Sequence, residues 1–303
     1  MKRSIFVLTF LFLLSALGAN GQTREDFPYV TAPYYINDNR AAAEWMALHF
    51  WDDYDFASCE SRYEPAANKR GFMTFIRTLY ATSLPNATKA IDQLMKRAAV
   101  SEDSYWFFLE VAEVMLYDPA SPLRDDMLWE HFVRHAVGEQ SPLDEPSKSR
   151  YRTLLALVGR NQQGTVATDF TYTLANGTQG RLHKIDAPFT LLWFYNPGCG
   201  ECAQTKADVV ASGYLDMLHS MGAIEVLAVY ADGDVAEWRK AQPEKPDWWI
   251  WAYDKGTVIQ NKNLYDLKAI PTLYLLDEQK RVILKDPDVE ALLGVLENIL
   301  YGN

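Results

Sequence analysis

The 303-residue chain has only three cysteines, fewer basic than acidic residues, and no apolar run long enough to cross a membrane. Three cysteines cannot build a disulfide scaffold, so stability has to come from apolar packing. A net charge of −11 repels phosphate backbones, which argues against nucleic acid as a partner. With 49% apolar and 23% charged residues, the composition is typical of a globular protein and excludes a disordered or fibrous chain.

The first residues have the order of an export signal. Two basic residues precede an apolar run at residues 5–14, and small residues follow up to Gly21. The run is too short for about 30 Å of hydrocarbon, which argues against a membrane anchor. We expect a signal peptide at residues 1–21 and a mature chain that begins at Gln22, its net charge moved from −11 to −13 by loss of the two basic residues. No cysteine precedes Cys59, so lipid attachment at a cleavage-site cysteine is excluded, and a periplasmic or otherwise exported location is expected.

Residues 25–160 carry apolar side chains at helical spacing and no convincing strand pattern, so we expect a helical bundle. Asn39 can cap the first helix, Pro65 suits the first turn of the second, and Ser121-Pro122 can open a later one. The apolar stripes lie at residues 41–50, 72–79, 91–98, 106–115, 128–133 and 154–158.

The pattern changes at residues 162–164. Continuous apolar runs are typical of strands buried on both faces of a sheet, and Asn176-Gly177 is a hairpin turn. Alternating strands and helices followed by a hairpin predict an α/β domain with a mixed sheet at 164–303, after a helical domain at 22–161. The expected strands lie at residues 165–173, 189–195, 224–230, 249–251, 272–276 and 281–284, and helices at 235–241, 258–264 and 289–301.

Cys199 and Cys202 stand in the segment NPGCGEC, directly after a buried run. Two thiols at this spacing can close a disulfide across the first turn of a helix. The free amides and positive dipole end of a helix N-terminus stabilise a thiolate, which predicts Cys199 as the nucleophile and Cys202 as the resolving thiol. A zinc site would need a second pair of ligands, and the sequence has none, so no metal is expected. A permanent structural disulfide is the less favoured alternative at a strand-to-helix junction.

Residues 164–303 resemble the thioredoxin superfamily, specifically its exported TlpA/ResA-like branch. The buried strand before the cysteine pair, the IPT segment at 270–272 before a later strand, and GTVATDF at 164–170 carry the resemblance. The helical half is similar to a domain of unknown function that precedes thioredoxin-like domains in some Gram-negative bacterial proteins. That likeness rests on the region around residues 48–52 and the domain order.

The resemblance implies a thiol–disulfide oxidoreductase without a bound cofactor. Pro271 would be cis and would lie against the cysteine pair, and the backbone of Ile270 would pair with a substrate strand. The expected partners are protein dithiol or disulfide clients and a thiol protein that donates or accepts electrons. The alternative is a non-enzymatic envelope module that uses the thioredoxin fold as a binding scaffold.

Several residues depart from the family pattern. Trp193 stands where cytoplasmic thioredoxins carry a buried acid, so the usual proton acceptor for Cys202 is missing. Glu201 could substitute, and its negative charge opposes a thiolate nearby, whereas Lys206 favours one. The redox potential therefore stays open. A peroxidase is disfavoured because Asn196 occupies the position where those enzymes carry threonine or serine.

Three weaker signals each have two interpretations. Cys59 is a third redox thiol or, more simply, an inert buried one. His131 and His135 could share a metal, but a surface or interhelix role is favoured. The tryptophans at residues 248–251 form either a stacking patch or, more simply, a strand with buried aromatic residues on both faces.

Overall fold

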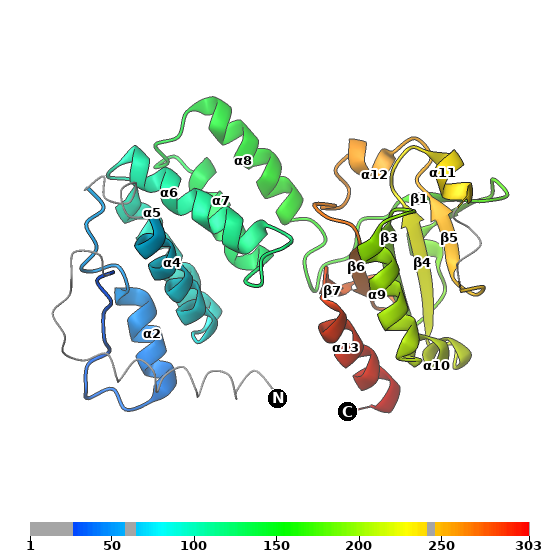
Figure 1. The fold of residues 1–303 in the computed structure, drawn as a ribbon, viewed down its shortest axis with the longest axis horizontal. Coiled ribbons are helices and arrows are strands. Elements are labelled where there is room, and N and C mark those ends of the chain that lie inside the picture. The colour runs from blue at the N-terminus through cyan, green and yellow to red at the C-terminus, as the bar shows by residue number, and fades with distance from the viewer. Residues whose placement is uncertain (1–26, 58–64, 241–245, 303) are drawn as a thin grey trace. The chain divides into compact units, whose positions relative to one another are not determined.

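The computed structural model describes residues 27–57, 65–240 and 246–302 (Figure 1). The signal peptide expected at residues 1–21 and the third cysteine, Cys59, lie outside the described residues.

Two compact units make up the chain, Met1–Leu155 and Ala156–Asn303. The division falls inside the helix that precedes residues 162–164, where the sequence pattern changes. The described residues of the first unit form helices and no strand, in agreement with the helical spacing of their apolar residues (Figure 1). These helices are α2 (Asn39–His49), α4 (Pro65–Tyr80), α5 (Leu84–Ala98), α6 (Glu102–Ala112), the π-helical turn η1 (Glu113–Tyr117), α7 (Asp126–Val137) and α8 (Glu145–Val158).

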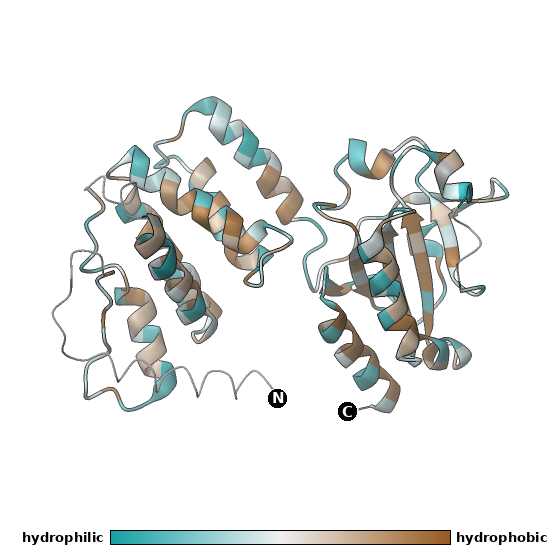
Figure 2. Cartoon of the chain, in the orientation of Figure 1, coloured by the Kyte–Doolittle hydropathy of each residue, from teal (hydrophilic) through white to brown (hydrophobic). Residues whose placement is uncertain are grey.

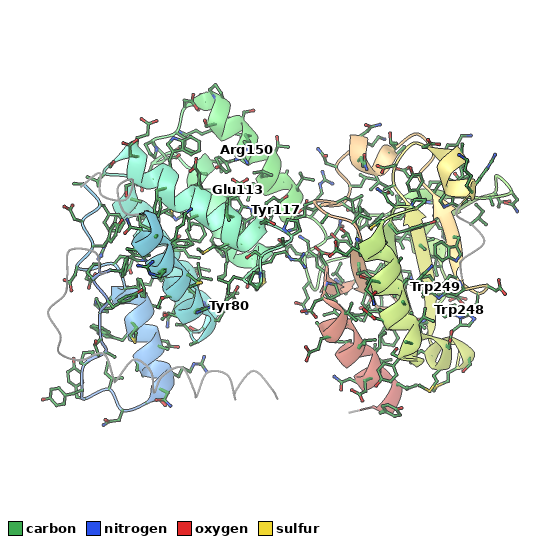
Figure 3. All side chains as sticks on the ribbon, in the orientation of Figure 1. Tyr80, Glu113, Tyr117, Arg150, Trp248 and Trp249 are labelled. Carbon is green, nitrogen blue, oxygen red and sulfur yellow. The ribbon has the colours of Figure 1, made fainter. Side chains whose placement is uncertain are left out.

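Aromatic rings fill the core of the first unit. Phe72 and Phe75 of α4, Phe108 of α6 and Phe132 of α7 are fully buried. Their ring centroids lie about 6 Å apart in several pairs, so the predicted apolar stripes meet in one cluster. The carboxylate of Glu113 in η1 ties α8 to this core by accepting hydrogen bonds from both terminal nitrogens of Arg150 (Figure 3).

Two predicted helix caps are wrong. Helix α2 is capped by Asp38 rather than Asn39, because Asp38 keeps an extended backbone and its carboxylate accepts the Ala41 amide at 2.8 Å. Helix α7 does not open at Ser121-Pro122. Asp125 caps it, and its carboxylate accepts two backbone amides at 3.0 Å each.

The Ser121 hydroxyl takes part in a turn instead, in which its oxygen accepts the Leu123 amide at 3.2 Å. It donates to the Met115 carbonyl at 2.5 Å and so closes the loop between η1 and α7.

The second unit is built on a seven-stranded sheet in the order β2-β1-β5-β4-β3-β6-β7. The three central strands run parallel, and the remaining pairs are antiparallel. Strand β4 is hydrophobic along most of its length, as a strand covered on both faces must be (Figure 2). The strands are β1 (Thr171–Leu174), β2 (Gln179–Arg181), β3 (Phe189–Tyr195), β4 (Ile224–Tyr230), β5 (Ile250–Tyr253), β6 (Thr272–Leu276) and β7 (Val282–Lys285).

Helices cover both faces of this sheet. Leu191 and Trp193 of β3 point to the face that α9, α10 and α13 cover, whereas Leu192 and Phe194 point to the other face, which α12 helps to cover. The fold is therefore the predicted mixed sheet flanked by helices. The helices are the 3-10 turn η2 (Leu182–Lys184), α9 (Gly200–Ala211), α10 (Tyr214–Ser220), α11 (Val235–Lys240), α12 (Val258–Asn261) and α13 (Val289–Tyr301).

Two predicted elements of this unit are too long. The strand expected at 165–173 begins only at Thr171, and Val166 makes an isolated bridge to Arg281. The helix expected at 258–264 ends at Asn261, because Asn263 takes a left-handed conformation, φ +50°, and the Leu264 amide closes back on the Ile259 carbonyl at 2.8 Å.

Asn161 ties the segment after α8 to the second unit. This residue is 5% exposed. Its side chain donates to the Leu264 carbonyl at 2.9 Å and accepts the Thr168 amide at 2.8 Å. The lysine ammonium of Lys285 also donates to the Val158 carbonyl at 2.9 Å. Val158 and Asn161 both precede residue 164, the expected start of the domain, so the chain is already hydrogen-bonded to this unit before that residue.

Candidate functional site

The cysteine pair lies where strand β3 passes into helix α9. Gly198 has a φ of +76°, a left-handed conformation that favours glycine and turns the chain sharply between the strand and the helix. Cys199 is the N-cap residue of α9, and its Sγ atom accepts a hydrogen bond from the backbone amide of Cys202 at 3.1 Å. A sulfur at this position receives one of the helix's free amides and lies at the positive end of the helix dipole.

The two thiols occupy different environments. Both are free, with Cys199 partly exposed and Cys202 only 6% exposed. Burial, followed by the hydrogen bond with Cys199 and that residue's charge, raises the pKa of Cys202 to about 12. The pair therefore consists of an accessible outer sulfur and a protonated inner one, which is the asymmetry expected of an attacking and a resolving thiol.

The predicted proline loop lies against the pair. The Ile270–Pro271 peptide bond is cis, which confirms what the family resemblance implies. The Cys199 thiol lies 3.6 Å from the Ile270 carbonyl oxygen, to which it can donate a hydrogen bond, although the two residues are 71 positions apart in sequence. Strand β6 begins directly after the proline, so the sheet fixes the position of this loop.

The two residues expected to tune the thiols are placed differently. Glu201 lies in the first turn of α9 with an exposed side chain, and it does not line the pocket beside the cysteines. Lys206 is half-buried on the same helix, one turn beyond Cys202, and lines that pocket. Trp193, at the position of the missing acid, is 2% exposed and contributes an indole to the pocket wall.

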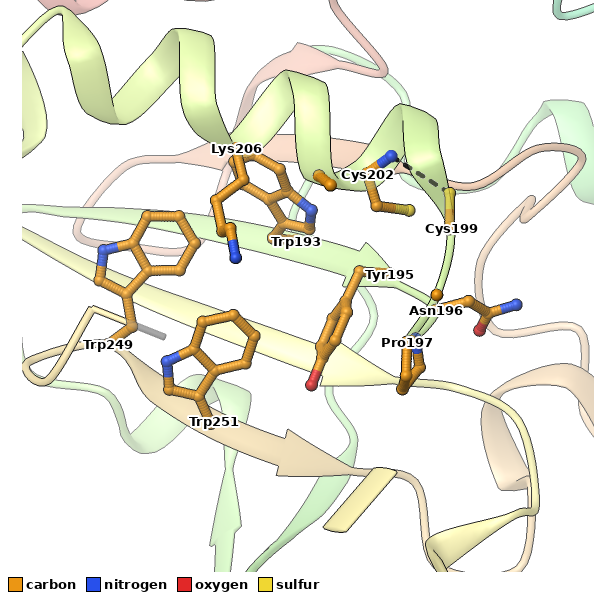
Figure 4. A pocket seen from close by; sticks show the side chains of 11 residues that line it. Trp193, Tyr195, Asn196, Pro197, Cys199, Cys202, Lys206, Trp249 and Trp251 are labelled. Carbon is orange, nitrogen blue, oxygen red and sulfur yellow. Dashed lines mark hydrogen bonds between the residues drawn. The ribbon is translucent and has the colours of Figure 1, made fainter. Parts of the chain in front are cut away.

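A pocket with a volume of about 100 Å³ opens beside Cys199 and Cys202 (Figure 4). Four aromatic rings from β3, β5 and the turn before β5 form much of its lining. The Tyr195 and Trp251 rings meet edge to face at 5.1 Å between centroids, and Trp249 stacks on Trp251 at 5.5 Å. The other lining residues are Trp193, Asn196, Pro197, Gly198, Ala203 and Lys206.

A ligand-stacking role for the tryptophan cluster stays a prediction, and the expected strand with buried aromatic residues on both faces is found only in part, because all three tryptophans pack against the same core cluster. Trp249 is 4% exposed and packs in the core, as a buried strand predicts, yet it also lines the pocket together with Trp251. Trp248 instead stacks on His219 at 4.0 Å. Sequence reasoning missed Tyr195. Its position two residues after Trp193 on one strand was the available signal, because residues at that spacing share a face.

His135, one of the paired histidines, has an interhelix role. His135 of α7 lies 2.7 Å from the Asp92 carboxylate of α5, measured from its Nε2 atom. His131 is half-buried, and this burial lowers its pKa. No group of three or more His, Cys, Asp or Glu side chains that could hold a metal occurs among residues 27–57, 65–240 and 246–302.

Comparisons with known proteins agree with this architecture. A family model described as a domain of unknown function, DUF5106, matches residues 14–161. The crystal structure of a thioredoxin-like protein from Bacteroides caccae is 33% identical, with 89% of this chain and 98% of that chain covered and a TM-score of 0.86. The chain belongs to the thioredoxin-like proteins.

Two further solved structures match slightly less than half of this thioredoxin-like chain. The C-terminal domain of an uncharacterized protein from Bacteroides fragilis is 43% identical, covering 45% of this chain and 98% of that one, with a TM-score of 0.44. A domain of a possible thiol-disulfide isomerase from Cytophaga hutchinsonii is 27% identical, covering 46% and 95%, with a TM-score of 0.41. A comparison with curated proteins gave no match.

Within the part of the chain that the structure describes, no helix has the length and apolar character needed to cross a bilayer.

Proposed function

We propose that this thioredoxin-like protein is an exported thiol–disulfide oxidoreductase of the TlpA/ResA-like type that exchanges disulfides with protein clients through Cys199 and Cys202. One observation carries the proposal. The Cys202 amide donates to the Cys199 sulfur at 3.1 Å at the start of α9, and that sulfur is partly exposed. This arrangement places an accessible sulfur at the positive end of the helix dipole, as expected of the attacking cysteine.

The reductive reaction takes place in two exchanges. The Cys199 thiolate attacks one sulfur of a client disulfide; a Cys199–client disulfide forms, the client disulfide breaks, and the second client sulfur leaves as a thiolate that takes a proton from water. Cys202 then loses its proton to water and attacks the Cys199 sulfur, and the client sulfur released from Cys199 leaves as a thiolate that takes a proton from water. The intramolecular disulfide forms, the mixed disulfide breaks, and the client departs as a dithiol that has gained two electrons. A partner dithiol returns two electrons to the oxidised protein.

The second exchange is the more difficult of the two, because Cys202 must first be deprotonated. Burial holds the Cys202 thiol protonated, with a pKa of about 12, so resolution requires removal of a proton inside the pocket. The Lys206 ammonium lies in the same pocket and favours the resulting thiolate by its charge. The exposed Glu201 side chain is screened by solvent and acts more weakly.

The cis-proline loop supports a role in client binding. Its backbone lies beside the Cys199 sulfur, and Ile270 and Pro271 precede strand β6. An extended client segment laid along this loop would bring its cysteine to Cys199. Export rests on residues 1–21, and an oxidising compartment outside the cytoplasm is where client disulfides persist.

Two serine variants test the assignment of roles. With dithiothreitol as the electron source, the unmodified protein should reduce insulin, and Cys199→Ser should abolish this activity. Cys202→Ser should accumulate mixed disulfides with client proteins, because attack remains possible without resolution. Full activity of Cys199→Ser, together with no trapped client for Cys202→Ser, would favour the non-enzymatic binding module instead. N-terminal sequencing of the exported protein should start at Gln22.

A further inference from the structure

Asn196 brings an unpaired carboxamide next to the attacking cysteine. The residue directly follows β3, and its carbonyl oxygen accepts the Cys199 amide at 3.3 Å, so the turn that carries the cysteine also fixes its backbone. Within residues 27–57, 65–240 and 246–302, neither polar atom of its side chain has a hydrogen-bond partner. Asn196 is only half-buried, and in Figure 4 its side chain extends away from the Tyr195 and Trp251 rings of the pocket.

Strand pairing brings Asn196 alongside the loop that is expected to bind clients. Strands β3 and β6 are antiparallel, with Phe194 opposite Thr272 at the end of the ladder, so two positions further in the same register Asn196 falls opposite Ile270. The Ile270 carbonyl oxygen lies 3.6 Å from the Cys199 sulfur, so Asn196 and Ile270 both adjoin the attacking cysteine. A client segment that pairs with Ile270 would run about 4.8 Å from that backbone, within reach of a side chain at position 196.

Both neighbours of the attacking cysteine are glycines. Gly198 and Gly200 are exposed, and a Cβ atom added to either would meet nothing within 4 Å. The surface on both sides of Cys199 is therefore bare backbone with open space in front of it. Bare backbone allows another chain to approach closely, so an extended client segment can reach Ile270 and Asn196 together.

A carboxamide carries the same hydrogen-bonding groups as a peptide unit. Its oxygen accepts from an N–H group, and its nitrogen donates to a carbonyl. The Asn196 side chain therefore complements the main chain of a client, whatever side chains lie next to the client cysteine. A small disulfide without amide groups offers no such pair of partners.

We infer that Asn196 gives the site its specificity for disulfides carried on a polypeptide. Its oxygen accepts a client main-chain N–H beside the reacting cysteine, and its nitrogen donates to a client carbonyl. Small disulfides without a peptide backbone gain nothing from this residue. The inference rests on the proposed function, because it assigns client recognition at that same site.

Two disulfides that differ in their main-chain groups test the inference. One is the disulfide-linked dimer of acetyl-Ala-Cys-Ala-amide, and the other is bis(2-hydroxyethyl) disulfide, which has no amide. Each is mixed in excess with the pre-reduced full-length protein, and the second-order rate constant for formation of the Cys199–Cys202 disulfide is measured by acid quenching and peptide mapping. The quantity compared among variants is the ratio of the peptide rate constant to the hydroxyethyl rate constant.

Three variants provide the comparison. Asn196→Ala should lower this ratio about tenfold, because two neutral hydrogen bonds are lost. Asn196→Asp keeps the acceptor oxygen and loses the donor, so its ratio should lie between those of the alanine variant and the unmodified protein. Asn298→Ala removes another exposed carboxamide, near the end of α13, and should leave the ratio unchanged. Because the ratio is taken within one variant, any effect of residue 196 on the thiols themselves cancels.

Methylated peptides identify the contact itself. The amide nitrogen of the client cysteine and that of the next residue are N-methylated one at a time. Where Asn196 accepts the N–H, methylation should slow the reaction of the unmodified protein but have a smaller effect on Asn196→Ala, because the partner is already gone. An amide that pairs with Ile270 should instead show the same loss in both proteins.

Failure of this inference is distinguishable from failure of the proposed function. The role of Asn196 would be overturned by an unchanged ratio in Asn196→Ala, whether both rate constants stay or fall together, or by equal effects of methylation in the two proteins at both amides. Either result would leave the oxidoreductase proposal standing. A reduced protein that neither disulfide oxidises would refute both.

Discussion

The rate at which Cys202 is alkylated should differ by orders of magnitude between the folded and the unfolded protein. The thiolate is the species that reacts with iodoacetamide. A thiol with a pKa of about 12 is ionised to about one part in ten thousand at pH 8, whereas a thiol at the ordinary value of 9.0 is ionised to about one part in ten. We therefore expect Cys202 in the reduced, folded protein to react about a thousandfold more slowly than Cys202 in the same protein unfolded in urea.

The assay is best made in a Cys59→Ala background, which leaves two thiols. Peptide mapping by mass spectrometry gives the rate at each cysteine, and the partly exposed Cys199 serves as the internal reference for reagent access. Because the folded protein holds the Cys202 proton, its rate should rise about tenfold for each pH unit as the pH approaches 12. Unfolding should remove the protection, since the largest cause of the raised pKa is burial.

A second variant separates burial from the other causes of the raised pKa of Cys202. Cys199→Ser removes the charge and alters the hydrogen bond that contribute to the raised pKa of Cys202, but leaves its burial intact. Slow alkylation should therefore persist in this variant. If Cys202 in the folded protein reacts within tenfold of the urea-unfolded rate, the inner thiol is not protected as its burial requires, and the reasoning for a protonated resolving cysteine fails.

Two stability predictions follow from hydrogen bonds in the thioredoxin-like unit. Asn161→Ala should lower the free energy of unfolding of this unit by about 3 kcal/mol in urea denaturation, because two partly buried backbone groups lose their partners and alanine disfavours the φ of +49°. An unchanged midpoint would mean that residue 161 is not anchored there. Asp288→Ala should cost about 1 kcal/mol, measured in the same way, since the Asp288 carboxylate caps α13 by accepting the Ala291 amide at 2.7 Å; Asp288→Asn should retain most of that stability.

Elements buried on both faces were the most predictable parts of the fold. The bounds of β3 and β4 match the expected runs at 189–195 and 224–230, because each run is apolar apart from one residue, Thr190 in β3 and Glu225 in β4. Helix α13 likewise spans the expected residues 289–301. The misplaced caps have a different cause. Several adjacent residues could cap α2 and α7, and competing local hydrogen bonds decide which one does so.

The site likewise has a part that the local sequence predicts and a part that it does not. The strand-to-helix junction at Cys199 follows from the local sequence, and the residues alone argued for an outer nucleophile and a deeper thiol. The contact between Cys199 and Ile270 joins positions 71 residues apart, and nothing in the local pattern brings them together. Only the resemblance to the thioredoxin superfamily implied it, because strand order and loop placement are properties of the whole sheet.

Side-chain type and spacing were insufficient to predict the aromatic pocket from the sequence. Alternation along β3 puts Trp193 and Tyr195 on one face, and alternation along the segment that enters β5 does the same for Trp249 and Trp251. Whether these two sets meet depends on β4, which lies between them, and on a register that places Ala228 in the row from Trp193 to Trp251. A shift of one residue in either pairing would replace Ala228 by a larger neighbour or turn its methyl group to the opposite face. The aromatic wall of the pocket therefore arises from the pairing of three strands, which no single segment of the sequence reveals.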